Sequence, residues 1–265
     1  MGMTMTQKIL AKHAGLESVK ERINELRLVM QFEGVSAPGH YIFAGNPGTG
    51  KTTVARLLGD LLCEVGALRR GHVIEVSRED LVADIVGGTA KKTKKILEQA
   101  LDGVLFIDEA YRLNEKSREA NWGKEAIDTI LVFMENNRNR ICIICAGYTG
   151  PMAEFMQSNP GLKSRFEDPI VFDDYDASEM LLILRKFAKD SGKNLSPEFE
   201  SQSEEVFKRW TIRKSADFGN GRDVRKYFDQ CKLALFKRLA KEYPSGNAPD
   251  EVKNLFTADD IPEKY

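Results

Sequence analysis

The sequence has little of what several classes of protein require. Only four of its 265 residues are cysteine, which favours a reducing compartment, such as the cytoplasm or an organelle stroma, over a disulfide scaffold. No apolar run approaches the roughly 20 residues that cross a bilayer, and the first residues lack the apolar core of a secretory signal. The formal charge of −1 lacks the basic excess typical of nucleic-acid binders. Membrane and nucleic acid are therefore not the expected partners.

One pair of cysteines, Cys142 and Cys145, has the spacing of a metal-binding motif. The pair lies inside the apolar run 141–146, and an offset of three along a strand points the two side chains to opposite faces. No second such pair exists to complete four zinc ligands. We therefore interpret both thiols as core residues.

A glycine-rich loop is the most informative motif that is present. Its residues are Gly45, Asn46, Pro47, Gly48, Thr49, Gly50, Lys51 and Thr52, which match the G-x-x-x-x-G-K-[ST] pattern. An apolar run precedes it and a helical pattern follows it, as a phosphate-binding loop requires. In such a loop Lys51 reaches the β- and γ-phosphates and the Thr52 hydroxyl binds Mg²⁺. The alternative is a glycine turn that binds nothing, but the eight positions and both flanks favour a site for a nucleoside triphosphate.

Two carboxylates, Asp108 and Glu109, follow a second apolar run that begins at Gly103. A strand that is apolar throughout belongs in a parallel sheet, where ligands bind at the carboxyl ends of the strands. Asp108 is therefore expected beside the glycine loop, where it can hold Mg²⁺ through water. Glu109 can then act as the general base toward an attacking water molecule. The carboxylate pair favours hydrolysis over phosphoryl transfer to a small metabolite.

Apolar runs and helical patterns alternate in the first two thirds of the chain, which predicts a parallel α/β sheet. A first helix is expected over 15–33. The five expected strands are Tyr41–Gly45, His72–Val76, Gly103–Asp108, Arg140–Gly147 and Pro169–Phe172.

From about residue 173 only helical patterns are found. Asp176 and Glu179 form a capping box, which predicts a helix from Ala177 to near Ser191, and further helices are expected over Pro197–Trp210 and Gly221–Lys241. The predicted fold is an α/β P-loop NTPase domain followed by a small all-helical domain, the outline of an AAA+ ATPase module. Four divisions are expected: an extension over 1–14, the α/β nucleotide-binding domain over 15–172, the helical lid domain over 173–242 and a C-terminal tail over 243–265. The repeated methionines of the extension suggest residues added for expression.

With these motifs, the chain resembles the CbbX/CfxQ branch of the AAA+ ATPases, which includes the red-type Rubisco activase and the SpoVK-like proteins. The likeness spans about residues 15–261 and is strongest in the stretches 45–54, 70–72, 104–111, 146–148, 157–161 and 164–166. Thr53, in the first of these, is expected to join the loop in binding ATP. The resemblance implies a ring, usually a hexamer, with ATP between subunits and mechanical work on a protein substrate.

The resemblance also implies roles outside the two motifs. Arg165 matches an arginine finger, which acts on the nucleotide of the neighbouring subunit; a surface ion pair is the alternative. Arg222 is the first choice for the sensor arginine of the lid, and Arg225 is the second; both could be solvated helix ends. Tyr148 stands where a γ-phosphate sensor is expected, and Leu16 stands near the expected adenine. A structural tyrosine and a plain core leucine are the respective alternatives.

One segment departs from the family pattern. Ile85, with Asp84 before it, occupies the position where an aromatic residue points into the central pore and grips substrate. An aliphatic side chain offers less contact area than a ring, so the departure weakens the threading hypothesis and leaves the ATPase hypothesis intact. Lys91, Lys92, Lys94 and Lys95 follow. We interpret them as the solvated start of a helix, with a basic pore rim as the alternative.

The leading hypothesis is a ring-forming ATPase, dependent on ATP and Mg²⁺, that remodels a protein partner. Two alternatives remain. One is an AAA+ ATPase that acts on nucleic acid, which salt-dependent stimulation by DNA or RNA would support. The other is a single nucleotide-binding module of a larger assembly.

Overall fold

The computed structural model describes residues 16–34, 37–85, 87–115, 120–213 and 218–265. By their contacts, these residues divide into two units, which are described separately. The first unit consists of the residues up to Asn46 and of Gly50–Asp173. The second unit consists of Pro47–Thr49 and Asp174–Tyr265. In the described part of the chain, no helix is both long enough and apolar enough to cross a membrane. The extension over 1–14 lies outside the described residues.

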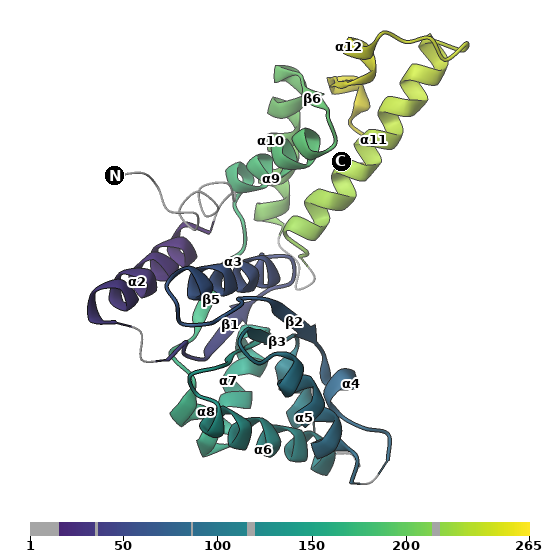
Figure 1. Ribbon diagram of the computed structural model, residues 1–265. Coiled ribbons are helices and arrows are strands. Elements are labelled where there is room, and N and C mark those ends of the chain that lie inside the picture. The colour runs from purple at the N-terminus through teal and green to yellow at the C-terminus, as the bar shows by residue number, and fades with distance from the viewer. Residues whose placement is uncertain (1–15, 35–36, 86, 116–119, 214–217) are drawn as a thin grey trace. The chain divides into compact units, whose positions relative to one another are not determined.

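The first unit is built on a parallel sheet of five strands (Figure 1). The strand order is β2-β3-β4-β1-β5, so the strand before the glycine loop lies between β4 and β5. The strands are β1 (Tyr41–Gly45), β2 (Val73–Val76), β3 (Val104–Ile107), β4 (Cys142–Gly147) and β5 (Ile170–Phe172). All five predicted strands are present, each within two residues of its expected ends, and the predicted parallel α/β sheet is confirmed.

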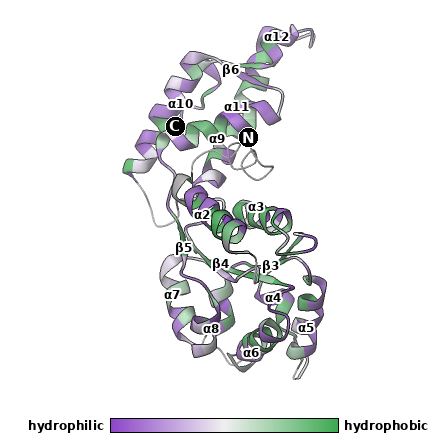
Figure 2. Ribbon diagram, turned by 60° about the vertical axis from the view of Figure 1, so that its left-hand side comes forward, coloured by the Kyte–Doolittle hydropathy of each residue, from purple (hydrophilic) through white to green (hydrophobic). Residues whose placement is uncertain are grey.

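Helices cover both faces of this sheet. They are α2 (Glu17–Glu33), α3 (Lys51–Glu64), α4 (Arg78–Leu81), α5 (Thr89–Gln99), α6 (Ala120–Asn136), α7 (Thr149–Gln157) and α8 (Pro160–Arg165), with a 3₁₀ turn η1 (Ala110–Asn114) after β3. In Figure 1, α2 and α3 lie on one side of the sheet and α5 to α8 on the other. Figure 2 shows the strands in the hydrophobic colour, and every residue of β1, β3 and β4 is buried.

The two cysteines of β4 are free and buried. Cys145 belongs to the apolar cluster that also contains Ile143 and residues of α5 to α7, whereas Cys142 does not. This difference fits the expected alternation of side chains along a strand. Burial raises the pKa of both thiols far above the usual range, so they remain protonated at neutral pH.

His40, just before β1, is a buried histidine that stays neutral. Its Nδ1 accepts a hydrogen bond from the backbone N–H of Ile143 at 3.1 Å, and its ring lies 5.9 Å from that of Phe166. Burial, and secondarily the charge of Arg165, lowers the pKa of His40 to about 4. The unfolded chain, with a histidine pKa of about 6.5, therefore binds a proton that the folded chain excludes.

This geometry predicts that acid destabilises the first unit. The contribution of neutral His40 is complete above about pH 6.5 and is lost as the pH falls toward 4, by up to about 3 kcal/mol. Urea unfolding at a series of pH values, with the wild type compared with His40→Gln, measures the difference. The wild-type free energy of unfolding should fall more steeply over this window; parallel curves would contradict the assignment.

The second unit is mainly helical, as predicted. It contains α9 (Ala177–Asp190), α10 (Pro197–Ile212), α11 (Gly221–Glu242), α12 (Asp250–Lys253), two short strands β6 (Asn194–Leu195) and β7 (Leu255–Phe256), and the 3₁₀ turn η2 (Ala258–Asp260). The predicted capping box at the start of α9 is present: the Asp176 carboxylate accepts from the N–H of Glu179, and the Glu179 carboxylate accepts from the N–H of Asp176.

A pair of strands in this unit was not predicted. β6 and β7 pair in parallel, with Asn194 opposite Leu255. Each strand has two residues, too few to show a periodic pattern. The pairing places Phe256, which is fully buried, with its ring 5.2 Å from Phe199 and 5.6 Å from Phe228. Residues of the expected C-terminal tail thus contribute to the core of the second unit.

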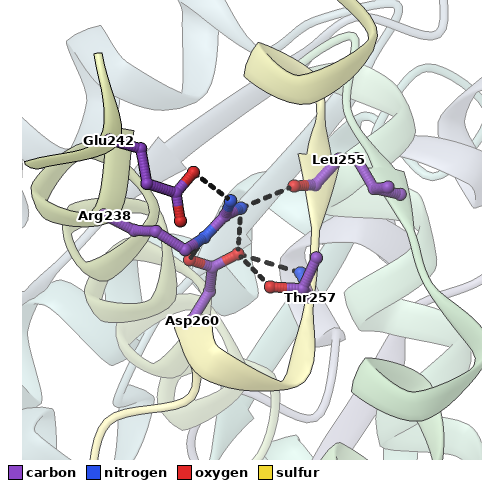
Figure 3. Close-up of polar contacts among 5 residues, drawn as sticks. All are labelled: Arg238, Glu242, Leu255, Thr257 and Asp260. Atoms are coloured by element: carbon purple, nitrogen blue, oxygen red, sulfur yellow. Dashed lines mark hydrogen bonds and ion pairs between the residues drawn. The ribbon is translucent and has the colours of Figure 1, made fainter. Parts of the chain in front are cut away.

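A buried ion pair joins α11 to η2 (Figure 3). Arg238 Nε and Nη2 donate to the two carboxylate oxygens of Asp260 at 2.9 and 3.0 Å, and Nη2 also donates to the Leu255 carbonyl. The Thr257 N–H donates to the same carboxylate at 2.9 Å. Asp260 is fully buried and the Arg238 side chain is 16% exposed. These contacts connect the segment 255–260 to α11, the longest helix of this unit.

Candidate active site

The glycine loop connects β1 to α3. Gly48 and Gly50 have φ of 74° and 93°, a region that favours glycine, and α3 begins directly after Gly50. A Cβ added at Gly45 would collide with the carbonyl of Phe172 on the adjacent strand. Gly48 and Gly50 are therefore required by their backbone conformation, and Gly45 by the close approach of the neighbouring strand. A loop that wraps phosphates has these features.

Lys51 is the first residue of α3. Its Nζ donates to the carbonyls of Gly45 and Asn46 at 2.8 and 2.7 Å, so the ammonium is held over the loop. The next residue, Thr52, is half-buried and Thr53 is exposed. An anion in the loop would meet both the ammonium and the first amides of α3. Pro47, Gly48 and the fully buried Thr49 group with the second unit.

Asp108 and Glu109 directly follow β3, and one strand, β4, separates β3 from β1. Because the strands are parallel, both carboxylates lie at the same edge of the sheet as the loop. The Asp108 N–H donates to the Val76 carbonyl at 2.8 Å, which continues the pairing with β2. The structure thus brings both sequence motifs to one edge of the sheet, as expected.

The backbone of Glu109 is unusual. Its φ of 48° and ψ of 43° place a non-glycine residue in the left-handed region, which costs about 1 kcal/mol or more. Its N–H donates to Asp108 Oδ1 at 3.1 Å and its carbonyl accepts from the Arg112 N–H at 2.9 Å. Such strain is common at functional sites, where the surrounding structure holds it.

Tyr148, the proposed γ-phosphate sensor, follows β4 at the same edge and caps α7. Its ring lies 6.3 Å from that of Tyr111 on η1. Burial, followed by the negative charges of Glu109 and others that include Asp108, raises the pKa of Tyr111. Tyr111 therefore lies among the candidate residues, a placement that sequence reasoning missed although Tyr111 comes only two residues after Glu109.

Arg165, the proposed arginine finger, ends α8 and lies in a groove against α6. Its Nη2 is 3.6 Å from the Glu135 carboxylate, and its Nη1 donates to the Gly161 carbonyl at 3.4 Å. The groove, of about 470 Å³, is also lined by Asp128, Val132 and Asn136. The side chain is 31% exposed, so part of it remains within reach of another molecule.

The two arginines proposed for the lid lie in the first two turns of α11, in the second unit. Arg222 is exposed, and its N–H donates to the Gly219 carbonyl at 2.9 Å. The Arg225 guanidinium stacks 3.6 Å from the centre of the Phe187 ring. This contact favours a structural role for Arg225, and Arg222 stays the first choice for the sensor.

Leu16 precedes α2, with a φ of 62° and 9% exposure. Its carbonyl accepts the N–H of Lys20, the first hydrogen bond of the helix, at 2.8 Å. The adenine contact proposed for Leu16 stays a prediction, and Gly15 lies outside the described residues.

Ile85, in the expected pore position, is 71% exposed. The lysines that follow are partly engaged within the unit: Lys92 Nζ donates to the carbonyls of Glu79 and Val82, and Lys94 lies 3.9 Å from Glu98. These contacts favour the interpretation of the run as a helix start over a basic rim.

Comparison with known proteins gives the family. A model described as "ATPase family associated with various cellular activities (AAA)" matches residues 41–174, and one for an AAA lid domain matches 176–265. The chain belongs to the AAA ATPase family. Membership implies nucleotide binding, and the loop and acidic motif described above lie within the matched residues. Crystal structures agree on the fold: the AAA domain of FIGL-1 matches with a TM-score of 0.66 at 16% identity, over 95% of this chain and 80% of that one.

Within the AAA family, the relatives confirm the CbbX/CfxQ resemblance. Protein CfxQ of Xanthobacter flavus is 42% identical over 248 residues, which cover 90% of this chain and 76% of that protein. The ribulose bisphosphate carboxylase/oxygenase activase of Cyanidioschyzon merolae is 41% identical over 236 residues, 85% of this chain and 79% of the relative. Protein CbbX of Cereibacter sphaeroides is 38% identical, over 92% of this chain and 80% of the relative.

Proposed function

We propose that this AAA ATPase forms a ring and uses Mg²⁺-dependent ATP hydrolysis to remodel a protein partner. The observation that carries the proposal is that the glycine loop, with Lys51 held over it, lies at the same edge of the sheet as Asp108 and the strained Glu109. One relative is a ribulose bisphosphate carboxylase/oxygenase activase. This similarity supports a ribulose bisphosphate carboxylase/oxygenase as the candidate partner. Recovery of carboxylase activity from an inhibitor-blocked carboxylase in the presence of ATP tests that partner.

The residues at the loop fit a magnesium ion that is shared with a nucleotide. The donors are oxygens, the Thr52 hydroxyl and the Asp108 carboxylate, which are hard ligands that suit Mg²⁺. No cluster of three or more metal-binding side chains occurs among the described residues, and Mg²⁺ in nucleotide sites takes most of its ligands from phosphate and water. When bound, the ion would neutralise phosphate charge.

The other candidate residues have the following roles in this proposal. Lys51 binds the β- and γ-phosphates, and Glu109 accepts a proton from the attacking water. Tyr148 faces the γ-phosphate, Arg222 links the nucleotide to the lid, and Leu16 packs on the adenine. Gly45, Asn46, Pro47, Gly48, Thr49, Gly50 and Thr53 complete the nucleotide-binding set.

Arg165 acts across a subunit boundary in this proposal. A guanidinium from the neighbouring subunit would stabilise charge on the transferring phosphoryl group. The Arg165 side chain is 31% exposed and its 3.6 Å contact with Glu135 is weak, so Arg165 is able to change partners.

Ring formation is tested by the mass distribution of Glu109→Gln with and without MgATP. This variant should retain ATP, and we expect a shift to a hexamer-sized species when ATP is present. Arg165→Ala in the same background should show a smaller shift. A monomer or dimer in all conditions would contradict the ring and favour a single module of a larger assembly.

A further inference from the structure

The aromatic side chain of Tyr111 packs against the end of β4. Tyr111 lies on η1, is half-buried and packs against the apolar core of the first unit. A Cβ added at Gly147 would lie 2.7 Å from Tyr111 Cδ1 and 2.9 Å from Tyr111 Cε1, which is closer than side chains normally approach. The φ of Gly147 is not positive, so its backbone does not require glycine. The missing side chain at Gly147 therefore makes room for the Tyr111 ring.

The same ring pairs with that of Tyr148. The two ring centroids lie 6.3 Å apart and the ring planes are tilted by 56°, within the range of favourable aromatic pairs. Tyr148 directly follows Gly147, and Gly147 lies opposite Ala44, the residue before Gly45 of the glycine loop. The ring pair is therefore at the edge of the sheet where the glycine loop begins.

The backbone of Tyr148 is fixed by α7. Its carbonyl accepts the N–H of Met152 at 2.9 Å, the first hydrogen bond of the helix, whereas its side chain does not cap the helix. Among the described residues, Tyr111 is the one whose ring meets that of the half-buried Tyr148. This ring contact limits the directions that the Tyr148 side chain can take.

The position of Tyr111 is set by the turn that follows the acidic motif. η1 begins after Glu109, and the N–H of Arg112 donates to the Glu109 carbonyl at 2.9 Å. Ala110, the residue before Tyr111, is 1% exposed. Tyr111 therefore connects the turn after β3 with the residues at the end of β4.

We propose that Tyr111 is a positioning residue whose ring, packed on Gly147, keeps the ring of Tyr148 directed toward the γ-phosphate. This role rests on the proposed role of Tyr148 as sensor and does not involve the general base. It requires the ring of Tyr111 and not its hydroxyl, because the contacts with Gly147 and Tyr148 are made by the ring. Tyr111 acts only through Tyr148 in this proposal.

Steady-state ATP hydrolysis by the full chain tests the role of the ring. Tyr111→Leu should lower kcat by about two- to tenfold, the range that corresponds to loss of one aromatic pair. KM for ATP should be unchanged, because the glycine loop and Lys51 carry ATP binding in the proposed function. Tyr111→Phe keeps the ring and should lie near wild type. Gly147→Ala should lower kcat by a factor similar to that of Tyr111→Leu, since its Cβ would displace the ring.

A double-mutant cycle tests whether Tyr111 acts through Tyr148. Tyr148→Leu should lower kcat at least as much as Tyr111→Leu. The double variant should be no slower than Tyr148→Leu alone, because the ring of Tyr111 then has nothing to position. A general loss of packing at the edge of the sheet would instead add to the effect of Tyr148→Leu.

Phe133→Leu is the matched control. Phe133 lies on α6, is half-buried and packs against the same apolar core as Tyr111. Its loss should lower the melting temperature about as much as Tyr111→Leu does but leave kcat unchanged. An equal fall in kcat in Phe133→Leu would assign the effect to stability and overturn the inference. Wild-type kcat in Tyr111→Leu or Gly147→Ala, equal losses in Tyr111→Phe and Tyr111→Leu, or an additive double variant would also overturn it.

Tyr148→Leu by itself separates this inference from the proposed function. If Tyr148→Leu lowers kcat while Tyr111→Leu hydrolyses ATP at the wild-type rate, only the positioning role fails. If Tyr148→Leu hydrolyses ATP at the wild-type rate, the sensor role of Tyr148 fails, and the positioning role fails with it. Glu109→Gln tests the proposed base separately, because no step of the inference passes through Glu109.

Discussion

Glu109→Gln should lower kcat for ATP hydrolysis by about 10²- to 10⁴-fold while ATP binding is retained. The amide keeps the length and shape of the side chain but cannot accept the proton of the attacking water. The loop and the Lys51 ammonium, which carry phosphate binding in the proposal, are unchanged by it. Phosphate release and the binding of a fluorescent ATP analogue, measured on the same preparation, check both parts of the expectation.

The matched control for this change is Glu98→Gln. Glu98 lies on α5, is 54% exposed and forms only a 3.9 Å pair with Lys94, so its amide should leave hydrolysis unaltered. Wild-type turnover in Glu109→Gln would show that another group takes the proton. Loss of binding together with turnover would instead show that the left-handed turn at Glu109 shapes the loop edge itself.

Asp260→Ala should lower the free energy of unfolding of the second unit by about 3–5 kcal/mol. The substitution leaves Arg238, only 16% exposed, without the carboxylate that accepts two of its N–H groups. It also removes the acceptor for the Thr257 N–H. Urea unfolding followed by tryptophan fluorescence measures the loss, since Trp210 lies in the same unit with its ring 5.9 Å from that of Tyr227.

Glu200→Ala is the comparison that isolates the effect of burial. Arg185 donates to both oxygens of Glu200 at 2.8 Å, a pairing of the same geometry, but its side chain is 47% exposed. We expect a loss of about 1 kcal/mol or less there. The double change Arg238→Met with Asp260→Leu should recover part of the stability, because it removes both charges of the buried pair together. Equal losses at both sites would contradict the importance of burial.

The sequence predicts the first unit well because its signals are local. The glycine loop is a contiguous motif, and the central strands are apolar on both faces, so neither needs distant partners to be recognised. The parallel order then brings Asp108 and Glu109 to the loop edge by a general rule. Their roles, and those of Arg165 and Arg222, stay predictions, since they concern a bound nucleotide and a neighbouring subunit.

Other features depend on contacts that no local pattern reveals. The pairing of β6 with β7 joins segments far apart in sequence, and the buried partnership of Arg238 with Asp260 looks like two ordinary surface charges in the sequence. The left-handed conformation of Glu109 and the contact of Arg112 with Glu79 on α4 are likewise features of the folded chain that no local pattern predicts. The motifs are therefore recognisable from the sequence, whereas the contacts around them are not.

The position of β1 within the sheet has a consequence for how the first unit folds. β1 pairs only with β4 and β5 in the described sheet, with Tyr41 opposite Ile144 and Phe43 opposite Ile170, so its partners lie about a hundred residues or more along the chain. Contacts of such long range form late, because a large loop must close first. The β2–β3 pair can form earlier from nearer segments. The nucleotide loop should thus be among the last parts to become ordered. ATP would then bind only to chains whose sheet is complete, and would stabilise that folded state.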